Sequence, residues 1–502
     1  MKIGWVIPGA SAGSGGIRTV IQNINGLDAQ GYDCGLHIVS GIADDTMAET
    51  EKARLGTLFD LENVPVSIGP IATGHYDLLI ATAWSTVHCV ILSNATHRGY
   101  FIQDFEPFFY PMGSEHIEAS NTYGCDLEAI ALGRWLPNKL FYEYGLNVRH
   151  FDFCADLDTY HDLKLPREHA ICAIYQPEKP RRCTRLLLSA LRIVSEIDPE
   201  MRIYLYGSKP QGNDLLDFHV NQLGIISTKE CNELYNKCLL GVCCSSSNPS
   251  RIPFEMMSTG LPVVDLYAEN NLYDFPDNAI SLAESTPEAL ATAIMGIADS
   301  PETFNSMHSA GIEFMTNRPL ENETRNAIEA IERIVCDKPS STNLPGKIFL
   351  KGPVHAGTAA LEASTRIAHR QVITCIESKT FEVRIHDRFG FQGLSTLKVP
   401  IWCAPDQSDI VWYDSEKLDD CTYSVKVSLK DHSYLPGEYQ IHVYGVQDDE
   451  TMQLLYTSKC YVKPSKTRFI GNARKNTSAK KQPHTKNSNQ NDRLMSIDIL
   501  PA

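Results

Sequence analysis

Apolar and polar positions alternate along the first third of the chain in two different periods. Short apolar runs, each of a length suited to a buried strand, are separated by segments whose apolar residues recur every three or four positions. Strands are predicted at residues 2–7, 35–39, 77–82 and 100–103, and a helix at residues 17–30. Strands that alternate with helices build a parallel sheet covered by helices. The pattern therefore predicts an α/β fold for residues 1–165.

A second alternation of the same kind begins near residue 170. It predicts strands at 170–175, 201–206, 239–244 and 261–266, with a helix at 183–195. A polar loop, residues 245–250, separates the strand at 239–244 from a short helix that begins near Pro253. Proline suits the first turn of a helix, and Gly260 suits the position just after a helix ends. A second parallel sheet is expected here.

The loop at 245–250 is a candidate ligand site. A loop that leaves a strand and enters a helix presents unpaired backbone N–H groups, which favour phosphate. Glu255 is placed to accept hydrogen bonds from sugar hydroxyls, and Arg251 supplies positive charge. The alternative is structural, because acidic residues favour first helical turns and most strand–loop–helix units simply build sheets. The stretch by itself is compatible with a ligand site and with a purely structural role.

A basic loop at residues 176–182 follows the first strand of the second sheet. Lys179, Arg181 and Arg182 stand just before a helix N-terminus, where cations oppose the helix dipole. An anion shared by the cations and the helix would remove this conflict. A diphosphate is therefore favoured over a solvated basic face.

Two further loops follow strand ends in the first sheet. Residues 13–16 form a glycine loop where such sheets bind ligands, although a glycine turn alone is weak evidence. Residues 101–113 place Gln103, Asp104 and Glu106 among clustered aromatics, a composition that suits sugar binding or an aromatic cover over the core. Asp156 and Asp158 match a short acid pair that can hold a divalent metal, but two carboxylates alone make a poor cation cage. No metal is expected.

The pattern of apolar and polar residues changes after residue 336. A linker at 337–375 precedes residues 376–464, where apolar and polar residues alternate singly, as at 423–429, which predicts a β-sandwich. Trp402, Trp412 and Tyr413 are expected to be core and surface aromatics rather than a glycan site.

Residues 465–502 are polar and basic and are expected to be disordered, serving either to contact anionic lipid or as a solvated tail.

Composition narrows the class of protein. A chain of 502 residues with 43% apolar and 21% charged residues fits about three soluble domains, and no apolar run reaches the roughly 20 residues that span a bilayer. The 15 cysteines form no C-x-x-C pair, which predicts free thiols in a reducing cytoplasm. The net charge is −16; residues 463–502 carry +7, so the remainder carries −23. An acidic body argues against nucleic-acid binding.

The order of these motifs resembles glycosyltransferase family 4 on the GT-B fold. The matching pieces are IPG…GSGGIRTV, FDFCADLDTY, YQPEKPRR, YLYGS, LGIISTKECNELYNKC and SSSNPSRIPFEMMSTGLPVV. The variants FIQDFEPFFYPMGSE and SNPSRIPFEMM are similar to the branch that uses dTDP-rhamnose to build bacterial surface glycans. The resemblance implies two Rossmann-like domains facing a cleft, 1–165 for the acceptor and 166–336 for the nucleotide sugar. Residues 376–464 resemble the GBS Bsp-like repeat, an immunoglobulin-like sandwich.

The resemblance also implies roles for particular residues. Glu255 would bind the ribose, Arg181 and Arg182 the diphosphate, residues 223–227 the base, and Asp104 the donor and acceptor. The implied catalytic residues are Asp104, Arg181, Arg182 and Glu255. The implied donor-binding residues are Gly15, Gly16, Lys179, Gly207, Ile225, Ser247, Asn248, Ser250, Arg251 and Glu255. The family pattern E-x7-E is broken at Ser247, and one carboxylate fewer suits a deoxy sugar with fewer hydroxyls.

The expected activity is sugar transfer with retention, without metal or other cofactor, from a nucleotide sugar, dTDP-rhamnose, to a growing glycan or lipid-linked acceptor. The expected location is the cytoplasm, at the inner face of the membrane. Two alternatives remain: an inactive glycan- or nucleotide-binding protein, suggested by Ser247, and a sugar epimerase or phosphorylase on the same fold. Nucleotide binding without turnover would favour the first, and independence from an acceptor glycan would favour the second.

Overall fold

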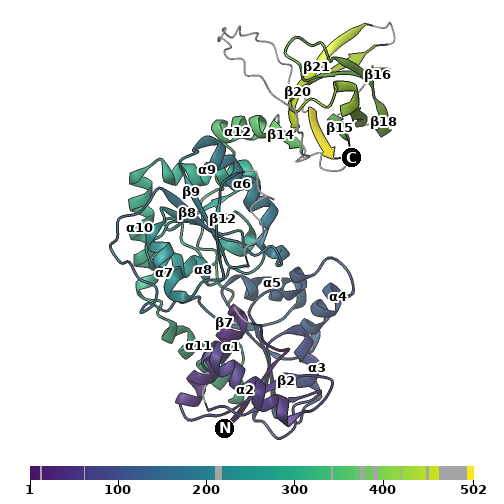
Figure 1. Cartoon of the computed structure of the whole chain (residues 1–502). Coiled ribbons are helices and arrows are strands. Elements are labelled where there is room, and N and C mark those ends of the chain that lie inside the picture. Colours follow the sequence, from purple (N-terminus) through teal and green to yellow (C-terminus); the bar gives the residue numbers. More distant parts are fainter. Residues whose placement is uncertain are drawn as a thin grey trace. The chain divides into compact units, whose positions relative to one another are not determined.

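The computed structural model forms two compact units, residues 1–361 and residues 362–502, and each is described by itself. The structure describes residues 1–11, 14–61, 63–209, 218–340, 343–368, 370–373, 379–387, 394–419, 421–447, 451–462 and 495–501. Figure 1 labels the elements of both units. In the described ranges, no helix combines the length and hydropathy needed to cross a bilayer.

The first sheet is parallel throughout, as predicted, with the order β3-β2-β1-β4-β5-β6-β7. Its strands are β1 (Lys2–Ile7), β2 (Asp33–Val39), β3 (Val66–Gly69), β4 (Leu78–Ala81), β5 (His97–Ile102), β6 (Glu128–Leu132) and β7 (Val148–Phe151). The accompanying helices are α1 (Gly15–Ala29), α2 (Asp45–Phe59), α3 (Val87–Ile91), α4 (Ser114–Asn121) and α5 (Trp135–Tyr144). Short 3₁₀ turns lie at η1 (Trp84–Thr86), η2 (Glu106–Phe109) and η3 (Thr122–Gly124).

The second sheet is also parallel, with the order β10-β9-β8-β11-β12-β13. Its strands are β8 (Ala170–Ile174), β9 (Arg202–Tyr206), β10 (Asn221–Gly224), β11 (Leu240–Val242), β12 (Val263–Leu266) and β13 (Ile280–Ala283). The helical elements are η4 (Pro180–Arg182), α6 (Thr184–Ile197), α7 (Thr228–Lys237), α8 (Ile252–Ser258), η6 (Glu269–Leu272), α9 (Pro287–Ala298) and α10 (Pro301–Thr316). Gly260 has a φ of +69°, which confirms the glycine predicted just after α8.

Helix α11 (Leu320–Val335) corrects the predicted domain boundary, which placed residues 166–336 in the second domain. It packs against α1 and against strands β5, β6 and β7 of the first sheet (Figure 1). The approach of the two helices is close, because a Cβ added to Gly26 of α1 would lie 2.3 Å from Cγ2 of Thr324. The apolar face of α11 therefore completes the core of the first domain.

The predicted linker, residues 337–375, is anchored to the second domain at Phe349 and Val354, although most of its described residues are exposed or half-buried. Phe349 is buried, and its N–H donates to the Leu272 carbonyl at 3.0 Å. The N–H of Val354 donates to the Leu282 carbonyl at 2.8 Å. Residues 358–368 then form helix α12 (Thr358–Ala368).

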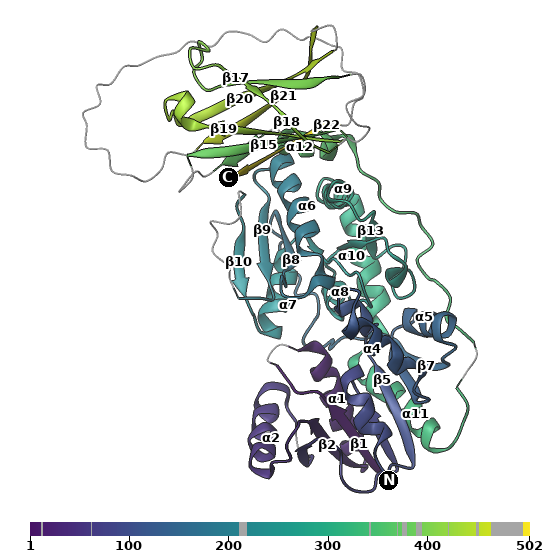
Figure 2. The same cartoon turned by 90° about the vertical axis from the view of Figure 1, so that its right-hand side faces the viewer.

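Apart from helix α12 and a 3₁₀ turn, η7 (Leu429–His432), the described part of the second unit consists of β-strands, as predicted. One sheet has the order β14-β21-β20-β16-β17 and the other β18-β19-β15-β22, in two layers (Figure 2). The strands are β14 (Arg370–Ile373), β15 (Thr380–Asp387), β16 (Thr396–Trp402), β17 (Val411–Asp414), β18 (Glu416–Asp419), β19 (Thr422–Ser428), β20 (Gly437–Val446), β21 (Met452–Val462) and β22 (Met495–Pro501). Side chains that alternate along β15, β16, β19 and β20 fill the core between the sheets.

Two expectations for this unit meet different outcomes. Trp402 is buried, Tyr413 packs against the core and Trp412 is 48% exposed, which agrees with core and surface aromatics.

The expectation that residues 465–502 lack regular structure is wrong for residues 495–501. These residues form β22, which pairs antiparallel with β15 because an edge strand binds any segment able to complete its ladder. Residues 463–494 lie outside the described residues.

Candidate functional site

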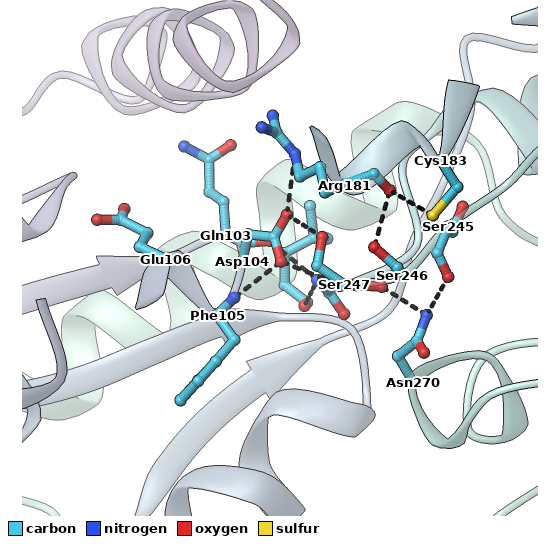
Figure 3. Close-up of polar contacts among 12 residues, drawn as sticks. Gln103, Asp104, Phe105, Glu106, Arg181, Cys183, Ser245, Ser246, Ser247 and Asn270 are labelled. Atoms are coloured by element: carbon cyan, nitrogen blue, oxygen red, sulfur yellow. Dashed lines mark hydrogen bonds and ion pairs between the residues drawn. The ribbon is translucent and has the colours of Figure 1, made fainter. Parts of the chain in front are cut away.

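Asp104 joins the two domains of the first unit. It follows β5 in the first domain, and its carboxylate meets the turn between β11 and α8 in the second (Figure 3). The Asn248 N–H donates to Oδ1 at 2.8 Å, and the Ser247 hydroxyl donates to Oδ2 at 3.0 Å. Burial raises the pKa of Asp104, and Arg181 opposes that rise. The predicted residues Asp104, Ser247 and Asn248 are therefore brought together.

The basic loop lies against the same turn. The Arg181 Nε is 3.7 Å from Oδ2 of Asp104, and its guanidinium lies 4.0 Å from the centre of the Phe109 ring. The N–H and hydroxyl of Ser246 donate to the Arg181 carbonyl at 3.3 and 3.0 Å, so the loop and the turn are tied together (Figure 3). The structure thus joins two sequence motifs that lie about 65 residues apart.

The three cations of this loop repel one another. Burial lowers the pKa of Lys179, and the nearby Arg181 and Arg182 lower it further. Burial also lowers the pKa of Arg181, which Asp104 partly restores. An anionic ligand at this position would stabilise all three charges.

Several buried polar atoms around the turn have no hydrogen-bond partner among the described residues. They are Nε of Arg182, Oγ of Ser245, Oδ1 of Asn248, Oγ of Ser250 and Nη1 of Arg251. Buried polar atoms are normally paired, so such a cluster marks a place where a ligand or water completes the bonding. Three of the five belong to residues 245–250, the loop that the sequence predicted to bind phosphate, and Arg251 follows it directly.

Arg251 has a structural partner that the sequence analysis did not predict. Its Nη2 lies 2.7 Å from Oε1 of Glu323 on α11 and 2.7 Å from Oγ1 of Thr19 on α1. The other oxygen of Glu323 accepts from the Cys154 N–H at 3.2 Å. The Arg251 side chain therefore ties α8 to the first domain.

Glu255 lies one turn into α8. Burial raises its pKa to about 6, against the attraction of Arg251 and Arg18. The carboxyl is therefore charged at neutral pH and able to accept hydrogen bonds from hydroxyl groups.

The structure supports a role in donor binding for some of the other predicted residues and not for others. Gly15 and Gly16 begin α1, and a Cβ added to Gly16 would lie 3.5 Å from Nε2 of Gln103, next to Asp104. Gly207 has a φ of +110° and a Cβ there would lie 2.6 Å from Ile174, so packing accounts for this glycine. Ile225 is 62% exposed, between β10 and α7.

The supports of the turn were missed by sequence reasoning. Asn270 donates from Nδ2 to the carbonyls of Ser245 and Ser247 at 2.9 and 2.5 Å (Figure 3). The buried Asp265 carboxylate accepts from the Ser245 N–H at 2.7 Å. Both residues follow the turn by about 20 positions, and the one available signal was polar residues inside and after the strand at 261–266.

The acidic pair considered for a metal has a local role. Asp156 accepts from the N–H groups of Asp158 and Thr159 at 3.2 and 3.1 Å, and from the Thr159 hydroxyl at 2.6 Å. Asp156 therefore stabilises a turn. Within the part of the chain that the structure describes, His, Cys, Asp and Glu side chains form no group of three or more suited to a metal ion.

Two parallel Rossmann-like domains joined at the ends of their strands define the GT-B fold, and solved structures agree with this assignment. Anabaena HepE in complex with UDP and glucose is 15% identical, with a TM-score of 0.51 over 66% of this chain and 99% of that chain. Anabaena HepE in complex with UDP-glucose is 15% identical, with a TM-score of 0.50 over 66% of this chain and all of that chain. At this identity the likeness supports the fold alone.

Family comparisons assign two segments. Residues 169–295 match the family described as WsaF, C-terminal domain, and residues 372–460 match the GBS Bsp-like repeat, which confirms the repeat predicted from the sequence. The O-antigen biosynthesis protein RfbC of Myxococcus xanthus is 29% identical over 223 residues. That alignment covers 43% of this chain and spans 17% of RfbC.

Proposed function

We propose that this chain is a glycosyltransferase that moves a sugar from a nucleoside-diphosphate donor to a cell-surface glycan. The observation that carries the proposal is the contact of the basic loop, through Arg181, with a turn in which several buried polar atoms have no partner among the described residues. The GT-B fold and the similarity to an O-antigen biosynthesis protein support the same class. In this assignment the cations and the turn hold the diphosphate, and Glu255 accepts from the ribose hydroxyls.

Breaking the bond between the sugar and the phosphate leaves one more negative charge on the nucleoside diphosphate. Arg181 and Arg182 stabilise that charge as it develops, because they are held in position before the reaction. A diphosphate that reaches the Asn248 N–H competes with the Asp104 carboxylate for the same donors. Asp104 is then released to the donor sugar and the acceptor.

The finer proposal is transfer of rhamnose from dTDP-rhamnose, with retention and without metal. Ser247 in place of a glutamate supports a deoxy sugar, since the site offers one acceptor fewer to sugar hydroxyls. The Asp104 carboxylate, contributed by the first domain, lies beside Ser247 and accepts from its hydroxyl at 3.0 Å. Retention follows if the leaving phosphate oxygen takes the acceptor's proton on the face from which the bond breaks.

We also propose a cytoplasmic location at the inner face of the membrane, where a lipid-linked acceptor is available. The basic segment of residues 463–494 would contact anionic lipid, at about 1 kcal/mol per basic residue near the surface. A deletion of residues 465–494 keeps β22 and is therefore a better test than removal of the whole tail. Co-sedimentation with anionic liposomes that is unchanged by this deletion would contradict the membrane contact.

The test of the donor is a thermal-shift panel of dTDP-rhamnose, dTDP-glucose, UDP-glucose and GDP-mannose. A donor at 100 times its Kd stabilises the fold by about 2.7 kcal/mol. The expected result is the largest shift with dTDP-rhamnose, followed by transfer that persists in EDTA and yields a product whose anomeric configuration, read by NMR, is that of the donor. Absence of both shift and transfer with every nucleotide sugar would refute the proposed activity. A shift without transfer would favour a binding protein.

A further inference from the structure

Glu106 is a buried carboxyl with no role in the donor site described above. Glu106 begins η2, two residues after Asp104, and is 7% exposed. Its Oε2 accepts from the Trp84 N–H at 2.6 Å, and its own N–H donates to the Tyr123 hydroxyl at 3.2 Å. Within the described residues, Oε1 has no hydrogen-bond partner. Figure 3 shows the Glu106 carboxyl on the side of Asp104 away from Ser247.

Two half-buried aromatic residues, Trp84 and Tyr110, are linked to this carboxyl through the Trp84 backbone N–H. The Trp84 indole N–H donates to the Tyr110 hydroxyl at 2.9 Å, and the two rings meet edge to face at 5.9 Å. Since the Tyr110 oxygen accepts from the indole, its own O–H proton is available to an external acceptor. We define Trp84, Glu106 and Tyr110 as the aromatic wall. It offers apolar ring surface, one hydroxyl donor and one carboxyl oxygen.

The aromatic wall and the cation loop differ in the ligands they suit. The loop carries three positive charges, which attract a diphosphate, whereas the residues of the aromatic wall carry none. Burial raises the pKa of Glu106 to about 8, and Asp104 adds to the rise, so this carboxyl is largely protonated at neutral pH. A protonated carboxyl both donates and accepts hydrogen bonds, as a neutral polyhydroxyl ligand requires. Aromatic faces pack on the C–H surfaces of such ligands.

We propose that the aromatic wall binds the acceptor sugar, with Glu106 and Tyr110 hydrogen-bonded to its hydroxyls and Trp84 packed on its ring. This inference rests on the proposed function and names the residues of the first domain that hold the second substrate. η2 contacts η4, which carries Arg181 and Arg182, so a sugar on the wall lies near the donor phosphates. Glu106 then fixes the acceptor and also holds the η1 loop through the Trp84 N–H.

The test compares Glu106→Gln and Tyr110→Phe with the matched control Glu118→Gln, an exposed glutamate on the nearby helix α4. The first readout is saturation-transfer NMR with p-nitrophenyl glycosides of rhamnose, glucose, galactose and N-acetylglucosamine. The second is the Kd of dTDP and of dTDP-rhamnose by calorimetry. The third is the acceptor KM against kcat in the transfer assay.

The expected result is acceptor binding to the wild type and the control, and a loss of about tenfold or more in both wall variants, with the donor Kd unchanged. Tyr110→Phe removes one hydroxyl and keeps the ring, so it tests the proposal even where Glu106→Gln alters the fold. Unchanged acceptor binding in Tyr110→Phe, or no glycoside bound by the wild type, would overturn the inference. Failure of the proposed function is distinct, since the wild type would then bind neither dTDP nor a nucleotide sugar.

Discussion

Replacing Arg251 by alanine separates a structural role from a role in ligand binding. In the wild type, the guanidinium ties α8 to α11 through Glu323 and to α1 through Thr19, each at 2.7 Å. The substitution removes both contacts at once. It leaves the Glu323 carboxylate, whose side chain is 2% exposed, with the Cys154 N–H as its remaining described partner.

The size of the effect follows from this burial. Removing one partner of a buried ion pair costs about 3–5 kcal/mol, because the remaining charge stays desolvated and uncompensated. Burial already raises the pKa of Glu323, and Arg251 is the group that opposes the rise. At about 2 °C or more per kcal/mol, Tm is expected to fall by about 6 °C or more.

The assay is urea unfolding and calorimetry of Arg251→Ala, Glu323→Gln and the double variant. The double variant is expected to lose less than the sum of the single losses, because Glu323→Gln removes the stranded charge. Arg333→Ala is the matched control, since Arg333 pairs with Glu329 on the exposed side of the same helix and should cost less than about 1 kcal/mol. A loss below about 1 kcal/mol for Arg251→Ala, together with donor affinity reduced tenfold, would refute the structural role.

Three further outcomes are expected. Arg182→Ala should lower turnover by about 10²-fold or more, as for other single electrostatic contacts to a developing charge, whereas Arg185→Ala on the exposed side of α6 should not; steady-state kinetics with an identified donor checks this. The pKa of Glu255, raised to about 6, predicts that donor affinity measured by calorimetry falls as pH drops through 6, and that Glu255→Gln binds about tenfold more weakly without this pH dependence. The Asp274 carboxyl accepts from the Arg134 N–H at 3.0 Å, and burial raises its pKa to about 7. Its neutral form therefore favours the folded state, and the stability it contributes is lost as pH rises toward and through 7. Asp274→Asn should flatten the fall of Tm between pH 5 and pH 8, and an unchanged slope would contradict that pKa.

The two parallel sheets and the sandwich were predictable from the sequence because each depends on local periodicity. Apolar runs marked the strands, and Gly260 marked the end of α8. The basic loop and the turn at 245–250 were also visible, since cations before a helix and a polar strand–helix loop are local features.

The meeting of these motifs was not predictable in detail. Asp104 and Asn248 are 144 positions apart, and Arg251 and Glu323 are 72 apart. No periodicity couples residues at such separations. The placement of α11 shows the same limit, because its apolar face fits either sheet and the chain path decides which one it covers.

The position of α11 has a consequence for synthesis and for protein engineering. A nascent chain released at residue 165 has all seven strands of the first sheet but lacks the helix that covers β5 to β7. The first domain therefore completes its core only after the ribosome has made all six strands of the second sheet. Expression of the first domain alone needs residues 320–335 fused back onto it, with a short linker bridging from the end of β7.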